Sequence, residues 1–320
     1  MINKWWHANP RYRSDQDLFE LTGLARWDFD RLVVLLELLW SEANKKRLDA
    51  ERLGPRKRIP GAGRPSIDFP SRLFVVLVFL RSDATYRRMQ ADYGVGKDLI
   101  CRSVAGVCEL IPTLGITRSD GSVILNEDGL HELLAEMADP SDEDEPGSVS
   151  GAVIVDGTFT QVGRPAGWEQ QKLLYNFHRH LHCLVFQTCV DHSGDLLWLS
   201  GHYPGSTHDL TALHKSILST LLKSTGVPFI GDKGYQGVRE RLELDVNQKV
   251  FLPAKKPRNG DLEKTDKIIN KAIAQIRIQV EHAHARLKSW RILRHYRGRH
   301  PRFTNIIQSI GVLITFSLRK

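Results

Sequence analysis

Apolar residues recur at helical spacing in two stretches of the first third of the chain. They are DFDRLVVLLELLW (28–40) and SRLFVVLVFLR (71–81), in which apolar positions lie three and four residues apart. A third segment, TYRRMQADYGVGKDLICRSV (85–104), has the layout of a helix-turn-helix, with a short helix, a turn at Gly94 and a second helix. The pattern predicts an all-α region over residues 1–118.

The helix-turn-helix interpretation makes specific predictions about side chains. The expected inward positions are Met89, Tyr93, Val95 and Ile100. Lys97 and Arg102 would then face DNA. Two features depart from the usual pattern, because Gln90 stands where a small residue allows close packing and Gly96 replaces a Ser or Thr cap. Two core helices of a small bundle would produce the same local pattern.

Beyond residue 150 the pattern changes to short β-rich runs. They are AVIVD (152–156), HCLVFQTCVD (182–191), LLWLSG (196–201), VPFIGD (227–232) and VFLP (250–253). The turn sequence DHSGD (191–195) would join the second and third runs as a hairpin, and a helical stretch follows at 208–224. Strands that alternate with helices predict an α/β fold over residues 151–320, a mixed sheet flanked by helices.

Charge separates these two regions. Residues 119–150 contain ten acidic residues and no Lys or Arg, whereas residues 1–118 carry a net +6 and residues 151–320 a net +12. This acidic connector holds one short helical pattern, LHELLAEMA (130–138), before DPSDEDEPGS (139–148). The flanking basic regions suit a polyanion such as DNA, although solvated surfaces often have the same charge.

The amino-acid composition bears on where in the cell the protein is found. The chain has 41% hydrophobic and 26% charged residues, and its four cysteines form no CxxC pair. The longest purely apolar run, Leu73 to Leu80, is far shorter than a membrane span, and MINKWWHANPRYR at the start lacks the apolar core of a signal peptide. These features predict a protein of the cytoplasm or nucleoid.

Two acidic residues follow hydrophobic β runs. Asp156 comes after AVIV and Asp232 after VPFI, and each lies next to a glycine. Groups at the carboxyl ends of neighbouring strands converge on one crevice of an α/β sheet. Taken singly, each Asp–Gly pair is also compatible with a turn that ends a strand.

A third acid lies on a long predicted helix. Its apolar stripe consists of Ile269, Ile273, Ile276, Val280, Ala283, Leu287 and Trp290, at steps of four and three. At about 100° per residue, Arg277, Glu281, His284 and Lys288 fall along one edge of this stripe. Glu281 is therefore expected at the border between core and cleft, although a solvated Glu–Lys face would look similar.

Three carboxylates together suit a hard cation. Mg²⁺ takes oxygen ligands, and Mn²⁺ commonly substitutes for it. Two such ions about 4 Å apart can activate an attacking hydroxyl and stabilise a leaving oxygen in phosphodiester displacement. Arg277 and Lys288 would then hold phosphates or orient Glu281.

Several ordered motifs resemble a known family. VDGTF, QKLLYNFHRHLH leading into FQTCVD, LLWLSGHYPGSTHD, GDKGYQG and the R-x3-E-x6-K pattern of 277–288 are similar to the DDE transposases of bacterial insertion sequences related to Harbinger elements. The similarity runs in order through residues 151–300. One position departs from the pattern, because Ala274 stands where related sequences have Tyr.

The resemblance implies an RNase H-like fold in which Asp156, Asp232 and Glu281 hold two Mg²⁺ ions. It implies an enzyme that hydrolyses DNA at element ends and then joins the freed 3′-hydroxyl to target DNA. Its partners would be double-stranded terminal repeats and target DNA, and a homo-oligomer would bring two ends together. Arg277 and Lys288 would assist catalysis.

Other residues carry over as candidate DNA contacts. They are Lys233 beside Asp232, and Arg291, Arg294 and Arg297 in RILRHYRGRHPR (291–302). Tyr235 shares the Asp232 loop. His208 and Asp209 match a family motif and are equally compatible with a helix cap. Trp168 could wedge a base, but packing in the core is expected.

Two other functions remain open on the sequence. HRHLHC (178–183) would place His178, His180 and His182 on one face of a strand, where they could hold zinc as in a metallohydrolase. Alternatively, a transposase-derived protein that has lost catalysis would bind specific DNA without cutting it.

Overall fold

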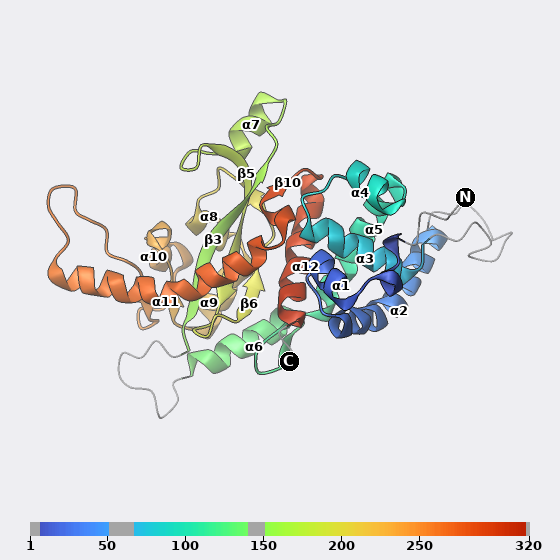
Figure 1. The fold of residues 1–320 in the computed structure, drawn as a ribbon. Coiled ribbons are helices and arrows are strands. Elements are labelled where there is room, and N and C mark those ends of the chain that lie inside the picture. The colour runs from blue at the N-terminus through green and yellow to red at the C-terminus, as the bar shows by residue number, and fades with distance from the viewer. Residues whose placement is uncertain (1–6, 51–66, 140–150, 318–320) are drawn as a thin grey trace, which may run out of the picture. The chain divides into compact units, whose positions relative to one another are not determined.

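The computed structural model describes residues 7–50, 67–139 and 151–317 (Figure 1). The chain divides into two compact units. The first contains the chain up to Leu114 together with Trp290–Ile292, and the second contains Gly115–Ser289 and Leu293–Arg319.

The first unit is helical, as the apolar periodicity predicts. Its elements are η2 (Pro10–Tyr12), α1 (Asp15–Thr22), α2 (Arg26–Ala50), α3 (Phe69–Arg81), α4 (Tyr86–Tyr93), α5 (Lys97–Leu110) and η3 (Ile111–Leu114). Residues 71–80 of α3 are all buried. Helices α1, α2, α4 and α5 all pack against α3 or its neighbours, so this apolar helix forms the centre of the unit.

Helices α4 and α5 form the expected helix, turn and helix. Gly94 ends α4 with a φ of 68°, a left-handed conformation that glycine adopts readily. The four residues expected to point inward, Met89, Tyr93, Val95 and Ile100, are all buried. The two helices, the glycine turn and the buried positions are therefore present, whereas the assignment of a helix-turn-helix domain that binds DNA stays a prediction.

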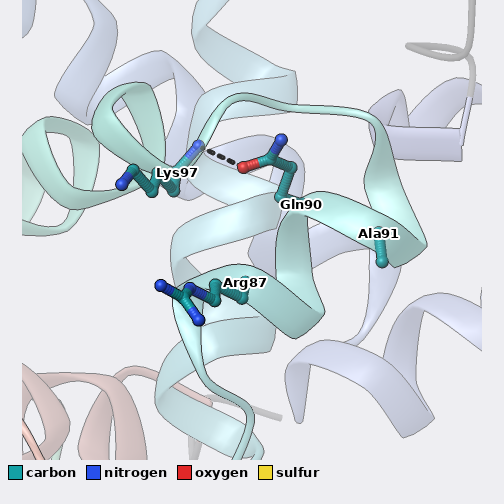
Figure 2. Close-up of a pocket in the computed structure, with 4 residues that line it drawn as sticks. All are labelled: Arg87, Gln90, Ala91 and Lys97. Carbon is teal, nitrogen blue, oxygen red and sulfur yellow. Dashed lines mark hydrogen bonds between the residues drawn. The ribbon is translucent and has the colours of Figure 1, made fainter.

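The two departures noted in the sequence offset each other. Gly96 makes no side-chain cap for α5. Instead, Gln90 reaches across from α4, and its Oε1 accepts a hydrogen bond from the Lys97 backbone nitrogen at 3.3 Å (Figure 2). Gln90 thereby satisfies one of the free N–H groups at the start of α5.

We expect Gln90→Ala to lower the free energy of unfolding by about 1 kcal/mol, the usual cost of losing a helix cap. Gln90→Glu retains an acceptor oxygen and is expected to stay close to the wild type. Thermal and urea unfolding followed by circular dichroism would measure both variants. Equal stability of the alanine variant and the wild type would show that Gln90 does not cap α5.

The second unit contains a mixed sheet, which confirms the predicted α/β class. Its strands are β3 (Val153–Val162), β4 (Tyr175–Asn176), β5 (Leu181–Val190), β6 (Leu196–Leu199), β7 (Tyr203–Pro204), β8 (Phe229–Ile230), β9 (Val250–Phe251) and β10 (His295–Tyr296). The path β4-β5-β3-β8-β9 forms the sheet, with β6 and β7 also paired to β5 and β10 to β3. β3, β8 and β9 are parallel, and β5 is antiparallel to β3. An RNase H-like topology stays a prediction.

The expected hairpin at 191–195 is confirmed, because β5 and β6 pair antiparallel across it. The predicted helix 208–224 is two helices, α8 (Asp209–His214) and α9 (Ile217–Thr225). The long helix is α11 (Lys264–Lys288), and α10 (Val238–Leu242) precedes it. Helix α12 (Phe303–Phe316), almost wholly buried, was not among the expected elements.

The acidic connector is partly folded into the second unit. Its strand β2 (Val123–Ile124) pairs with β1 (Ile116–Thr117), which comes just before the connector. The expected short helix is α6 (Glu127–Ala138), and its Leu130 and Leu134 belong to the hydrophobic core formed with α9 and β3. Residues 140–150 lie outside the described residues.

Helix α7 (Trp168–Leu174) corrects one expectation. Trp168 was expected in the core, yet it is 72% exposed at the start of this helix. None of the helices in the described ranges is both long enough and apolar enough to cross a membrane.

Candidate active site

Asp156 is not a turn residue, and the expectation that it ends its strand is wrong. It is the fourth of ten residues in β3. The strand continues because β5 pairs with it from Ile154 to Gln161, and β10 pairs with its last two residues. The Asp–Gly pair therefore lies in the middle of the sheet.

The site lies where β8 stops pairing with β3. The parallel register aligns Ile154 with Ile230, so Asp156 and Asp232 each follow this pair by two residues. β5 occupies one edge of β3 throughout, which leaves β8 and β10 on the other edge, at its two ends. Residues 155–160 of β3, which lie between them, pair with no strand on this edge. We call this unpaired stretch the notch; Asp156 lies at its start and Asp232 just past the end of β8, so the two acids meet as expected although only Asp232 follows a strand end.

Asp156 is buried and paired with α11. Arg277 Nη2 lies 2.7 Å from Asp156 Oδ2, and the Gly157 backbone nitrogen donates to Oδ1 at 2.8 Å. Burial raises the pKa of Asp156 to about 6, although Arg277 opposes the shift, and the negative charge of Asp232 raises it further. The carboxyl group therefore changes protonation near neutral pH.

Asp232 holds the loop that follows β8. Its Oδ1 accepts a hydrogen bond from the Gly234 backbone nitrogen at 2.7 Å and caps η4 (Lys233–Tyr235). The turn function and a site function are therefore compatible, because this bond uses only one carboxylate oxygen.

Asp209 is a further acid at this place. The cap role considered for His208 and Asp209 is confirmed for His208, the N-cap of α8, whose Nδ1 accepts a hydrogen bond from the Leu210 nitrogen at 3.3 Å, while Asp209 lies in the first turn of the helix. A Cβ added to Gly157 would collide with the Asp209 carboxylate, and one added to Gly234 would lie 2.8 Å from Asp232 Oδ1 and 3.1 Å from Asp209 Oδ2. Burial and then Asp232 raise the pKa of Asp209. The two glycines thus leave room for closely spaced carboxylates.

Tyr235 is buried next to the three aspartates. From the sequence, its place beside Asp232 made Tyr235 a candidate DNA contact; this is wrong, because the side chain is fully buried. Its hydroxyl accepts a hydrogen bond from Gln187 Nε2 at 2.9 Å, and the same Nε2 donates to the Asp209 backbone oxygen at 2.8 Å. Burial raises the pKa of Tyr235 well above its ordinary value, and the three aspartates add to the shift. A neutral tyrosine therefore lies beneath the negative cluster.

Glu281 lies on α11 between two residues that bond to the sheet, but it bonds to none of the acids. Arg277, one turn earlier, reaches Asp156, and His284, one turn later, bonds Thr188 Oγ1 of β5 at 2.8 Å. Glu281 itself is exposed. Within the described part of the chain it has no hydrogen-bond or ion-pair partner. The structure therefore brings Asp156, Asp232 and Arg277 together and leaves Glu281 facing solvent.

Lys288 contacts β3 rather than an acid. Its ammonium donates to the Phe159 carbonyl oxygen and lies 4.5 Å from the centre of the Phe159 ring. Burial lowers the pKa of Lys288 to about 8, with Arg179 as a second cause. Burial likewise lowers the pKa of His284 to about 4, which keeps this ring neutral. Lys288 thus satisfies a carbonyl in the open stretch of β3.

The carboxylates of Asp156, Asp209 and Asp232 are suitable ligands for a hard cation, but their present positions do not form a complete metal site. The mutual repulsion of Asp156, Asp209 and Asp232 is what a bound divalent cation would relieve. Among the described residues, however, no three His, Cys, Asp or Glu side chains are grouped closely enough to hold a metal ion in their present positions. A metal complex therefore requires side-chain movement, of Glu281 above all.

The other candidate DNA contacts lie on the surface. Lys97, Arg102, Lys233, Arg291, Arg294 and Arg297 are all exposed. Arg87, Gln90, Ala91 and Lys97 line a pocket between α4 and α5, and the two cationic side chains extend to the same side of it (Figure 2). Tyr296 is different, because it is buried in β10 and its hydroxyl donates to the Arg299 carbonyl oxygen.

The zinc alternative loses its geometric basis. His178 and His180 lie in the turn between β4 and β5, and only His182 lies in a strand. The three rings therefore do not share one strand face.

Two polar residues of the site were not anticipated. Gln187 and Thr188 are buried in β5, in register with Gly157 and Asp156. Their sequence signal is an adjacent pair of polar residues within the otherwise apolar run HCLVFQTCV. Such a pair in a buried strand needs polar partners.

The chain is similar in sequence to known DNA-cutting and transposition proteins. Residues 155–314, which include Asp156, Asp232 and Glu281, match the model of the DDE superfamily endonuclease family. A probable transposase for insertion sequence element IS702 from Microchaete diplosiphon is 29% identical over 300 residues, which cover 91% of this chain and 91% of that protein.

One solved structure also aligns over most of the chain. The crystal structure of the Mos1 mariner paired end complex with Mn matches 90% of this chain and 95% of its own, at 12% identity and a TM-score of 0.22. A TM-score this low carries no argument about fold or function.

Proposed function

Because the chain belongs to the DDE superfamily endonucleases, we propose that it is a transposase that cuts DNA at the ends of an insertion sequence and joins them to target DNA. The observation that carries the proposal is the parallel register of β3 and β8. It brings Asp156 and Asp232 to one notch, within the matched family region.

Asp156, Asp232 and Glu281 would hold the metal, two Mg²⁺ ions or Mn²⁺ in their place. The ions supply activation of the attacking oxygen and stabilisation of the leaving oxygen. Glu281 would turn inward from its exposed position on α11. Asp209 adds negative charge beside Asp232.

Arg277 changes partner in this scheme. In the structure it neutralises Asp156 at 2.7 Å. If a cation were bound at Asp156, Arg277 would be free to bind a phosphate oxygen of the DNA or Glu281. Lys288, held against Phe159, contributes positive charge at the notch and keeps β3 in place.

DNA recognition is assigned to the first unit. Helix α5 would lie in the major groove, with Lys97 and Arg102 toward the DNA. Lys233, Arg291, Arg294 and Arg297 would contact phosphates. Joining two element ends calls for a homo-oligomer. Ala274, where related sequences have Tyr, leaves the handling of the second strand to other residues.

A second function is favoured by the outward position of Glu281. A protein of this family that has lost catalysis would bind element ends through the first unit without cutting them. It would need neither an inward Glu281 nor a bound metal.

A cleavage assay separates the two functions. The substrate is a labelled duplex that carries the DNA flanking this gene, incubated with Mg²⁺ or Mn²⁺. We expect cutting at a defined end by the wild type and none by Asp232→Asn. Specific binding by both proteins without cutting in either metal would establish the binding function instead.

The pKa of Asp156 predicts a pH dependence of stability and metal binding. A folded pKa of about 6 exceeds the unfolded value of about 3.9, so the native state holds this proton more tightly. The free energy of unfolding should therefore fall as pH rises from about 4 to about 6, by at most roughly 3 kcal/mol. Since a cation binds only the ionised carboxylate, the rise in Tm caused by Mn²⁺ should grow between pH 5 and 7.

Scanning calorimetry with and without Mn²⁺ at pH 5, 6 and 7 measures both effects. Asp156→Asn is expected to weaken both dependences, and Asp261→Asn, at an exposed ion pair with Lys256, to leave them unchanged. A Mn²⁺ effect of the same size at all three pH values would show that Asp156 does not exchange a proton for the metal.

A further inference from the structure

Residues 163–182, which we call the distal arm, lie at the tip of the long β3–β5 pair (Figure 1). The arm exposes large apolar side chains. It contains α7, β4 and the turn 177–180. Trp168 is 72% exposed, Phe177 70% and Leu173 52%. Three large exposed apolar side chains on one short segment indicate a binding surface for another molecule.

The arm is held in place, so this exposure does not come from fraying. Asn176 Nδ2 donates to the Gly205 carbonyl oxygen at 2.8 Å, and the Ser206 nitrogen donates to the Leu173 oxygen at 3.2 Å. Leu174, the last residue of α7, is buried. Because these hydrogen bonds fix the backbone, the exposed rings are already in position, and less conformational entropy is lost when a partner binds.

The charge of the arm selects the kind of partner. It carries Arg164, Lys172 and Arg179 against a single acid, Glu169, and three histidines besides. A polyanion is attracted to this surface. A second copy of the same arm would be repelled by it, and the whole chain is also positive, at +8.

The arm continues into the acid notch through Phe159. The Arg179 guanidinium lies 4.1 Å and the Lys288 ammonium 4.5 Å from the centre of the Phe159 ring. Phe159 follows Asp156 by three residues on β3. From Thr188, the partner of Asp156, to Leu181 at the base of the arm is seven residues, or roughly 23 Å of strand. A nucleic-acid strand that runs from the acids to the arm would therefore pass Lys288 and Arg179, the second of which belongs to the arm.

We propose that the distal arm binds unpaired bases of DNA next to the cut, with Trp168 and Phe177 stacking on the bases. This rests on the proposed function, because the acids define where the cut occurs. Paired bases offer no free faces, whereas bases of a single strand stack on aromatic rings beside basic residues. Arg164, Lys172 and Arg179 would contact the phosphates of the same strand.

The test is a binding measurement on the full chain in EDTA, where no cleavage occurs. The probes are a fluorescent blunt duplex of the element end and the same duplex with a single-stranded extension of about five nucleotides. The wild type should bind the extended probe more tightly. The double variant Trp168→Ala/Phe177→Ala should lose roughly tenfold to a hundredfold on the extended probe and less than about threefold on the blunt one.

Two single variants separate stacking from other contacts. Trp168→Phe retains a ring and should keep most of the affinity, whereas Leu173→Ala removes apolar surface from the same helix without a ring and should have no effect. Equal affinity of wild type and double variant for the extended probe would overturn the proposal. So would an equal loss in Leu173→Ala accompanied by a smaller sedimentation coefficient, which would identify the arm as a contact between copies.

A failure of the arm proposal and a failure of the proposed function give different experimental results. A wild type that never cuts DNA contradicts the transposase activity and leaves the binding result as it stands. Normal cutting with unchanged binding by the double variant contradicts only the arm.

Discussion

Asp156→Asn is expected to lower metal-dependent cleavage by at least about a thousandfold, the scale seen when a residue at the reacting centre is removed. The amide cannot carry the negative charge that binds the cation, although it occupies the same place in β3. Asp232→Asn and Glu281→Gln are expected to act in the same way. End-binding should change little, because the predicted DNA-reading residues Lys97 and Arg102 lie in the first unit.

Matched controls are available on the same unit. Asp261→Asn changes an exposed acid paired with Lys256, and Glu132→Gln changes an exposed acid on α6; both should cut at the wild-type rate. Thermal unfolding would confirm that Asp156→Asn is folded, since Arg277 loses its partner there. Cleavage at a normal rate by any of the three active-site variants would remove that residue from the set of metal ligands.

Glu281 makes this series informative. The structure leaves its side chain exposed, whereas Asp156 is buried in the notch. A loss in Glu281→Gln equal to that in Asp156→Asn would mean that α11 presents Glu281 to the site when metal and DNA bind. A loss confined to the two aspartates would assign the third carboxylate to another residue, with Asp209 already beside Asp232.

Replacing Lys97 and Arg102 together by alanine is expected to weaken binding to the element end by about a hundredfold. Each base contact is worth about 1–3 kcal/mol, and each lost phosphate contact also lowers the salt slope by about one. Binding to random DNA should weaken by less than about tenfold, because it depends on total charge alone. Both residues are exposed on α5, whose buried face includes Ile100 and Val104.

Fluorescence anisotropy at several salt concentrations would measure these affinities. Arg88→Ala is the control, because it removes an exposed charge of the same unit that pairs with Asp92 on α4. Equal losses on the element end and on random DNA would contradict the assignment of α5 as the reading helix. A loss in Arg88→Ala as large as in the double variant would show that the effect is only electrostatic.

The sequence by itself determined the class of each region and the identity of the acids. Helical periodicity predicted α2, α3 and α11, and the inward positions of α4 and α5, because burying an apolar face requires that spacing. The β runs and the DHSGD turn predicted the mixed sheet and its β5–β6 hairpin. Ordered motifs pointed to the family that residues 155–314 match.

Contacts between residues distant in sequence were decided only by the tertiary structure. Asp156 lies within β3 rather than at its end because β5 and β10 extend the ladder past it, and no local pattern encodes a partner strand. The pairing of Arg277 with Asp156, 121 residues apart, depends on how α11 lies on the sheet. The position of α8 brings Asp209 to Gly157, and the position of α11 leaves Glu281 in solvent. Periodicity can place a residue on a face of a helix, whereas the neighbouring strands and the space left by glycines determine which group its side chain meets.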